Sequence, residues 1–171
     1  MDKKPILYII MRNDLPSMNI GKAMAQASHA SAQFVAKYKN TTVLPNETET
    51  AFRAWINEGN NFGTTIVLEG SYSSISNFTI DTLDNSSILQ HGGIIDGTYP
   101  FKAQKELLDI MDLKENNKKN IQIVDDTIDK FGMVFCTRIE TTCYWMFFYG
   151  TDEEHELFKE LCKKHNIELH R

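Results

Sequence analysis

Three polar side chains with complementary chemistry recur at helical spacing near the start of the chain. Lys22, Gln26 and His29 are separated by four and then three residues, so a helix would align them along one side. An ammonium group stabilises negative charge, an amide orients a neighbour, and an imidazole transfers a proton. Together they predict a polar helix face that can hold a phosphate or carboxylate group.

The first turn of the same helix strengthens this prediction. Unpaired N–H groups and the positive end of the helix dipole favour a negative ligand there. Gly21 lets a ligand approach the backbone closely, and Lys22 adds a positive charge beside it. The positive charge of a lysine at a helix start interacts unfavourably with the positive end of the helix dipole. The position of Lys22 therefore favours a functional role over that of a plain surface side chain.

A strand and a turn must position this helix. Residues 6–11 form an apolar run with the length and composition of a buried strand, and residues 14–17 supply turn chemistry. Asn19 can cap a helix that runs from Ile20 to about Tyr38. The apolar stripe that we expect to pack on the sheet consists of Ile20, Met24, Ala27, Ser31, Phe34 and Tyr38.

The stretch from Arg12 to Ala30 resembles the signature of the type II peptidyl-tRNA hydrolases. It follows an N-terminal strand and carries Arg12, Asp14-Leu15, Met18, Gly21-Lys22, Ala25-Gln26 and His29-Ala30 at the family's spacing. Met24 departs from the pattern, since the family usually has a small residue there. The resemblance is close over residues 5–38 and loose over the rest of the chain.

This resemblance implies a hydrolase that cleaves the ester between a peptide and the terminal ribose of tRNA. It implies no metal and no cofactor, and its partner is peptidyl-tRNA or the tRNA acceptor end. The family further implies a homodimer. The residues implied at the catalytic site are Lys22, Gln26, His29 and Asp96, and those implied in substrate binding are Arg12, Asp14, Gly21 and Thr98.

The water-activating carboxylate has more than one candidate. In the family a strand ends in an acidic residue that is followed by a glycine and a threonine, and Asp96, Gly97 and Thr98 match this order with a shorter spacing. Asp96 can equally be part of a plain Asp-Gly turn. Asp125 or Asp126, after the strand candidate at residues 121–124, is the alternative.

The resemblance also implies an α/β fold, a single domain over residues 1–171 with a mixed four- or five-stranded sheet and helices on both faces. We expect an insertion at about 101–131, with a helix over 101–119 that has a basic end. Strands are expected at 64–68, 86–100 (broken at Gly92-Gly93 and ended by Asp96-Gly97), 120–124, 133–139 and 143–149. Further helices are expected at 71–83, at 152–164, and around Ala51 to Ile56 after a loop at 39–50, capped by Thr48 or Thr50.

Composition bounds the function. No apolar run is long enough to span a bilayer, the N-terminus lacks a signal-peptide apolar region, and three cysteines without metal-ligand spacing read as reduced thiols. These features predict a cytoplasmic protein with no membrane partner.

Trp145, Phe147 and Phe148 are expected in the core rather than in a base-stacking platform. Thr137, Thr141 and Thr142 are second-rank candidates for lining the site.

A binding protein on the same scaffold is the rival prediction. Such a relative would have lost hydrolysis and would hold a nucleotide, a tRNA end or a protein partner. The net charge of −5, the short Asp96 to Thr98 spacing and the insertion favour it.

Overall fold

The structure, a computed structural model, describes residues 2–40, 45–58, 63–82, 84–108 and 121–170. Its mixed sheet has six strands in the order β3-β5-β1-β2-β6, with β4 paired to β5. The predicted α/β class is confirmed, and the sheet has one strand more than the upper figure of five. In chain order the elements are β1 (Lys4–Arg12), α1 (Ile20–Asn40), α2 (Asn46–Asn57), β2 (Thr65–Gly70), α3 (Tyr72–Thr82), β3 (Ile88–Gln104), η1 (Lys105–Leu107), β4 (Ile121–Asp125), β5 (Met133–Gly150), α5 (Asp152–Lys164) and β6 (Glu168–Leu169).

Two compact units make up the chain. The first comprises Met1–Ile94 and Thr142–Arg171, and the second comprises Ile95–Thr141. The predicted insertion at about 101–131 falls within the second unit. Strands β3 and β5 each contribute residues to both units.

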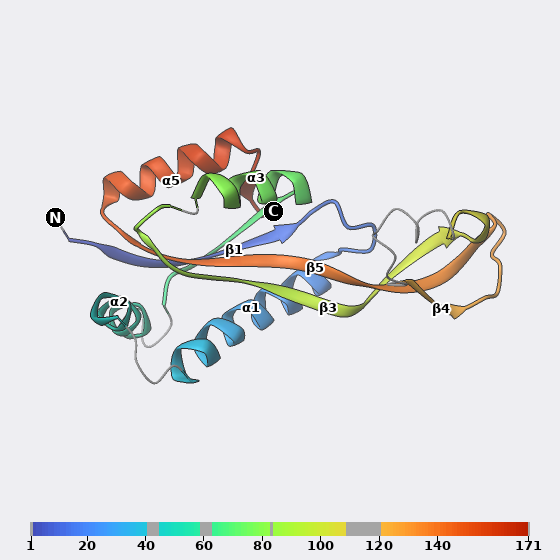
Figure 1. Cartoon of the computed structure of the whole chain (residues 1–171), viewed down its shortest axis with the longest axis horizontal. Helices are drawn as coiled ribbons and strands as arrows, with labels where there is room; N and C mark the ends of the chain where they lie inside the picture. Colours follow the sequence, from blue (N-terminus) through green and yellow to red (C-terminus); the bar gives the residue numbers. More distant parts are fainter. Residues whose placement is uncertain (1, 41–44, 59–62, 83, 109–120, 171) are drawn as a thin grey trace. The chain divides into compact units, whose positions relative to one another are not determined.

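Strand β1 is the centre of the first unit. It pairs in parallel with β2 and antiparallel with β5, and its residues from Leu7 to Met11 are all buried. Leu7, Ile9 and Met11 join one apolar cluster with α1 and α2, whereas Tyr8 and Ile10 join another with α3 and α5. The sheet therefore carries helices on both faces, α3 and α5 on one and α1 and α2 on the other (Figure 1).

Helix α1 packs on the sheet through a different stripe from the predicted one. Ala23, Ala30 and Phe34 are buried, whereas Ile20 and Met24 are 70% and 69% exposed. Residues 23, 27, 30 and 34 also recur at steps of four and three, so small side chains occupy the contact and let the helix lie close to the strands. The predicted helix bounds and the contributions of Ala27, Phe34 and Tyr38 are confirmed, but the places of Ile20 and Met24 are wrong.

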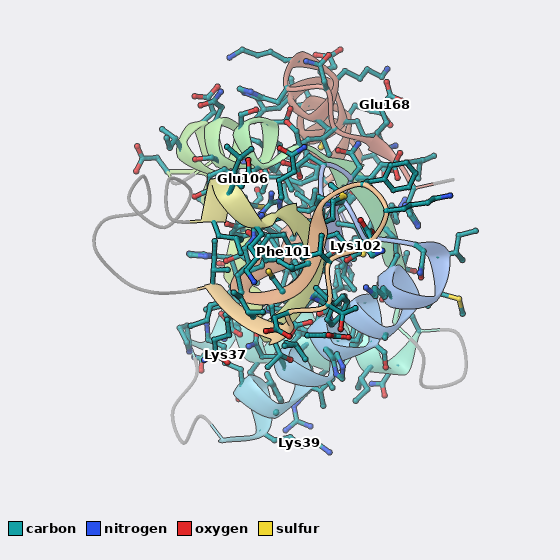
Figure 2. All side chains as sticks on the ribbon, turned by 90° about the vertical axis from the view of Figure 1, so that its right-hand side faces the viewer. Lys37, Lys39, Phe101, Lys102, Glu106 and Glu168 are labelled. Carbon is teal, nitrogen blue, oxygen red and sulfur yellow. The ribbon has the colours of Figure 1, made fainter. Side chains whose placement is uncertain are left out.

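Strand β3 is longer than predicted. It runs without interruption through Gly92-Gly93 and Asp96-Gly97 to Gln104, so the expected break and turn are wrong. Phe101 is buried and Lys102 beside it is exposed (Figure 2), a period of two that continues the strand where a helix was expected. The short helix η1 follows, and residues 109–120, with the predicted basic end at Lys114, Lys118 and Lys119, lie outside the described residues.

Strand β5 is one continuous strand, so the division into two strands predicted at 133–139 and 143–149 is wrong. Its first part pairs with β4, and its last part pairs with β1 along residues 143–150. The second unit has its own small core of Phe101, Ala103, Leu108, Val134 and Cys136. Trp145, Phe147 and Phe148 are buried in the first unit, as predicted.

Helix α2 begins earlier than predicted. Pro45 is its N-cap, so Thr48 and Thr50 lie inside the helix and the second half of the expected loop is helical. Thr50 donates to the carbonyl of Asn46, within its own helix, at 2.8 Å. The predicted helices α3 and α5 are confirmed, and Thr151 and Glu154 form a capping box at the start of α5.

The three cysteines are free thiols, as predicted, and all three are buried. Burial raises the pKa of the Cys143 and Cys162 thiols to about 12, which keeps them protonated and unreactive. In the described parts of the chain, every helix is too short or too polar to cross a bilayer.

Replacing Gly92 is predicted to destabilise the protein. A Cβ at this position would lie 2.7 Å from atoms of the rigid Trp145 indole, so Gly92→Ala is expected to cost about 1–3 kcal/mol in urea denaturation. Gly97→Ala is the matched control on the same strand, because a Cβ there meets no described atom within 4 Å. Equal stability of the two variants would contradict the tight packing of Trp145 on β3.

Candidate active site at the start of helix α1

Lys22 is held at the first turn of α1. Its backbone N–H donates to the Asn19 side-chain oxygen at 3.0 Å, which confirms Asn19 as the helix cap. Its ammonium group donates to the Ser17 hydroxyl at 3.0 Å, across the turn before the helix. The positive charge therefore stays beside the exposed helix start, where Gly21 is also exposed.

Gln26 is fixed to the sheet by a buried threonine. Thr142 is fully buried on β5 and donates to the Gln26 side-chain oxygen at 2.8 Å. The same hydroxyl lies 3.2 Å from the Ile94 carbonyl, so its single proton is shared between two acceptors. The Cys143 thiol also donates to the Gln26 carbonyl at 3.7 Å. Gln26 is thus oriented by two neighbouring residues of β5.

The polar stripe of α1 consists of Lys22, Gln26, His29 and Gln33, and its last two residues differ in their surroundings. His29 is exposed on α1. Gln33, one step further, accepts from the Trp145 indole at 2.7 Å and donates to the Gly93 carbonyl at 3.4 Å. Gln33 therefore ties the helix to β3 and β5, whereas Lys22, Gln26 and His29 mark the part suited to a ligand.

Arg12 and Asp14 form a two-point ion pair at the end of β1. The Arg12 Nε and Nη2 atoms lie 2.9 and 3.0 Å from the two Asp14 oxygens, and the Arg12 side chain is only 8% exposed. Asp14 also accepts from the backbone N–H of Tyr72, the first residue of α3, at 3.2 Å, and the Tyr72 ring lies 5.0 Å from the guanidinium. This pair joins β1, the turn before α1 and the start of α3.

The candidate acids lie in the second unit. Asp96 accepts from the Thr98 N–H at 2.9 Å and lies 3.4 Å from the Thr98 hydroxyl. Asp125 accepts from the Thr127 N–H at 2.9 Å, and hydrogen bonds from Thr127 hold the pKa of Asp125 below its ordinary value. Asp126 is exposed. The choice of Asp96 over Asp125 and Asp126 therefore stays a prediction.

Three residues gain importance from the structure. The sequence placed Thr142 among the second-rank candidates, because its partner Gln26 is 116 residues away. Arg138 and Glu140 form an ion pair of 2.7 Å whose side chains are 18% and 15% exposed, with the guanidinium 5.0 Å from the Phe101 ring. Their spacing of two on a strand puts both on one face, which is the one signal the sequence offered.

A small pocket opens at the carboxyl ends of β1 and β2 beside the start of α1. Its volume is about 260 Å³, and its walls include Arg12, Asn13, Asn19, Glu69 and His170. In the described part of the chain, no three His, Cys, Asp or Glu side chains are arranged to hold a metal ion.

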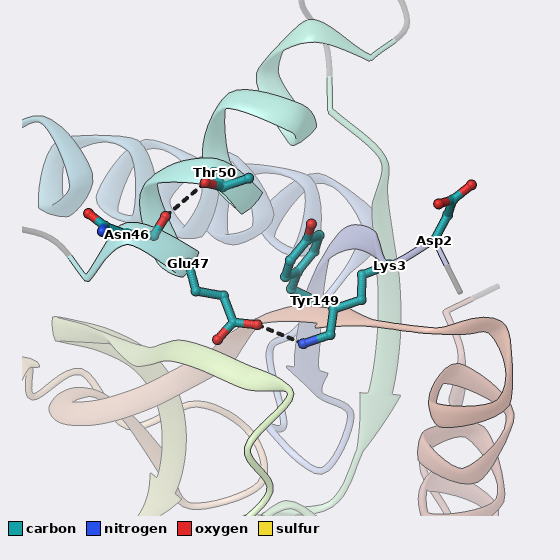
Figure 3. A pocket seen from close by; sticks show the side chains of 6 residues that line it. All are labelled: Asp2, Lys3, Asn46, Glu47, Thr50 and Tyr149. Atoms are coloured by element: carbon teal, nitrogen blue, oxygen red, sulfur yellow. Dashed lines mark hydrogen bonds and ion pairs between the residues drawn. The ribbon is translucent and has the colours of Figure 1, made fainter.

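A wider hollow of about 660 Å³ lies between the N-terminal strand and α2 (Figure 3). Lys3 and Glu47 pair within it at 2.6 Å, and Asn46, Thr50 and Tyr149 also line it. None of the predicted site residues lines it. The exposed Lys3–Glu47 pair offsets two of the charges in this hollow, and Asp2, which also lines it, adds a negative charge.

Comparison with known families finds a match to the first part of the chain. Residues 6–77 match the family model described as peptidyl-tRNA hydrolase PTH2, which confirms the predicted resemblance to the type II peptidyl-tRNA hydrolases. The match runs from β1 into α3 and includes Lys22, Gln26 and His29, but ends before Asp96. At the level of the family it supports a hydrolase of translation that acts on peptidyl-tRNA. No curated protein sequence matches the chain.

The Arg12–Asp14 pair predicts a pH dependence of stability. Burial opposes ionisation of Asp14, but hydrogen bonds from Arg12 and Tyr72 outweigh it and hold the Asp14 pKa below its ordinary value. Its stabilising contribution should be complete above the unfolded pKa of about 3.9 and disappear as the pH falls through the lower folded pKa.

Urea denaturation at several pH values tests this. At pH 7, Asp14→Asn should lose up to about 1 kcal/mol, since solvent screens the pair, and the gap from wild type should shrink as the pH falls through the lowered folded pKa of Asp14. Asp84→Asn, which removes an exposed carboxylate outside this turn, is the control. A gap for Asp14→Asn that is independent of pH would rule out the charge as its cause.

Proposed function

We propose that this chain hydrolyses peptidyl-tRNA at the ester that joins the peptide to the terminal ribose. The observation that carries the proposal is the polar start of α1, where Lys22 and Gln26 belong to the segment matched to the family and are held by Ser17 and Thr142. A charge and an amide fixed beside an exposed helix start are suited to an oxyanion and its phosphate neighbours.

The reaction needs water and no cofactor. Water attacks the ester carbonyl and loses a proton to a carboxylate, for which Asp96 is our choice. The carbonyl oxygen becomes an oxyanion, which the Lys22 ammonium and the N–H groups of the first helical turn stabilise. The bond from carbonyl carbon to ribose oxygen then breaks, and the ribose oxygen takes up a proton, which His29 can deliver.

The remaining site residues act on binding and orientation. Gln26 positions the ester or the Lys22 side chain, and the exposed Gly21 allows the substrate to approach the backbone. Arg12 and Asp14 fix the turn that leads into α1, and Thr98 orients Asp96. The partner is the acceptor end of peptidyl-tRNA, and the family resemblance supports a homodimer in the cytoplasm.

A binding module without hydrolysis is the second candidate. One observation favours it: the family match ends at residue 77, before the Asp96 carboxylate, which is hydrogen-bonded to Thr98 in its own strand. Such a protein would use the same helix face to hold a tRNA end or a nucleotide.

Release of peptide from a labelled peptidyl-tRNA tests the proposal. Wild type should release it, Lys22→Met should be slower by about 10²–10³-fold in kcat through loss of oxyanion stabilisation, and Asp96→Asn by about 10²–10⁴-fold through loss of the base. Lys39→Met is the matched control, an exposed lysine in the last turn of the same helix (Figure 2).

Asp125→Asn separates the two candidate acids. It should leave kcat unchanged, and a larger loss for it than for Asp96→Asn would move the base to Asp125. An inactive wild type that still binds tRNA would replace the hydrolase by the binding module.

A further inference from the structure

The small pocket beside α1 holds a carboxylate–imidazole pair that the proposed reaction does not use. Glu69, on β2, lies 2.6 Å from the Nδ1 atom of His170, which directly follows β6. Both side chains are mostly buried, with 29% and 27% exposed. They meet because β6 pairs with β2, and the pairing brings residues about 100 positions apart in the sequence to one edge of the pocket.

The protonation pattern of this pair follows from its chemistry. An ionised carboxylate only accepts hydrogen bonds, so the Nδ1 atom of His170 carries the proton that Glu69 accepts. In the neutral ring Nε2 is then an acceptor. Glu69 and His170 together therefore offer hydrogen-bond acceptors to a ligand with an amino group.

The charge of the pocket argues against an anionic ligand. Arg12 is its one strongly basic lining residue, and Asp14 matches that charge through two hydrogen bonds. Glu69 adds a negative charge. A phosphate or carboxylate would meet this carboxylate at short range, whereas an uncharged ligand with a donor group would not.

The volume of the pocket and the residues that line it limit the choice of ligand further. About 260 Å³ is below the roughly 300–1,000 Å³ typical of sites for drug-sized molecules, so the occupant is a small group. Met11, Met18 and Ala23 supply apolar walls, and thioethers pack well on flat rings. Asn13 supplies an amide with both donors and an acceptor, the group that pairs with adenine in nucleic-acid recognition.

We propose that this pocket binds an adenine ring, that of the terminal adenosine of tRNA. The exocyclic amino group of adenine donates to Glu69 or His170, its ring nitrogens accept from the asparagine amides, and its faces lie against the methionines. This inference rests on the proposed function for the source of the adenosine. The pocket shares its first helical turn with Lys22, since Asn19, Ile20 and Ala23 line it, so a bound base would leave its ribose next to the ester site.

Discrimination between adenosine and inosine tests the proposal. Inosine has an oxo group in place of the amino group, so it would turn an acceptor toward Glu69 and bind at least about tenfold more weakly. Glu69→Gln can donate to that oxo group, so the preference should disappear in this variant. Glu160→Gln, an exposed glutamate of α5 outside the pocket, should keep it.

NMR titration of methyl-labelled methionines locates the binding. Adenosine should shift the Met11 and Met18 methyl signals saturably and leave that of Met146, in the cluster on the other face of the sheet, unchanged. Thermal unfolding of each variant, measured in parallel, identifies any variant that is misfolded. If Glu69→Gln is misfolded, His170→Gln serves as the second variant. Equal binding of adenosine and inosine by wild type would overturn the adenine assignment. So would the same methyl shifts when lysine amide, an amine without an adenine ring, is the ligand that produces them and adenosine is not.

The outcome is separable from the hydrolysis assay. Adenosine selectivity in a protein that releases no peptide supports the pocket and counts against the proposed function. Peptide release without adenosine selectivity overturns the pocket alone.

Discussion

The close approach of α1 to the sheet is the constraint on which the site depends. Ala23 and Ala30 are almost fully buried against the strands, and only side chains of this size let a helix lie so near. The short separation brings the Gln26 carbonyl to the Cys143 thiol and the Gln26 side chain to the Thr142 hydroxyl. The rotation of the helix is thereby set, and with it the direction of the polar stripe that begins at Lys22.

The same region of the sheet gathers the other groups suited to a ligand. β1 and β2 are parallel neighbours, and α/β proteins commonly bind ligands outside the carboxyl ends of such strands. Arg12 and Asp14 link β1 to the start of α3 on one side of the small pocket. Glu69 and His170 form another side of the pocket, where β2 pairs with β6. The ester chemistry and the proposed base pocket thus share one turn of helix α1.

Local signals were enough to predict α1, its Asn19 cap and the helix α5, because caps and periodicity act within a few residues. The prediction of the buried stripe of α1 was wrong because it followed hydrophobicity, and Ile20 and Met24 are more hydrophobic than alanine. The short distance between α1 and the sheet instead favours alanine at the contact. Residues 101–104 were misjudged because pairing within the sheet outweighs helix propensity. Thr142 ranked low because its role depends on Gln26, which is distant in sequence and reaches it only in the folded chain.

The central claim is that the polar start of α1 receives the acceptor end of peptidyl-tRNA. The most direct measurement is an NMR titration with an RNA minihelix that carries its peptide through a non-hydrolysable amide in place of the ester. The account predicts that the largest backbone shifts fall on residues 20–29 and on Thr142 and Cys143, which contact Gln26. Saturable binding whose shifts fall on α5 and leave α1 unchanged would contradict it.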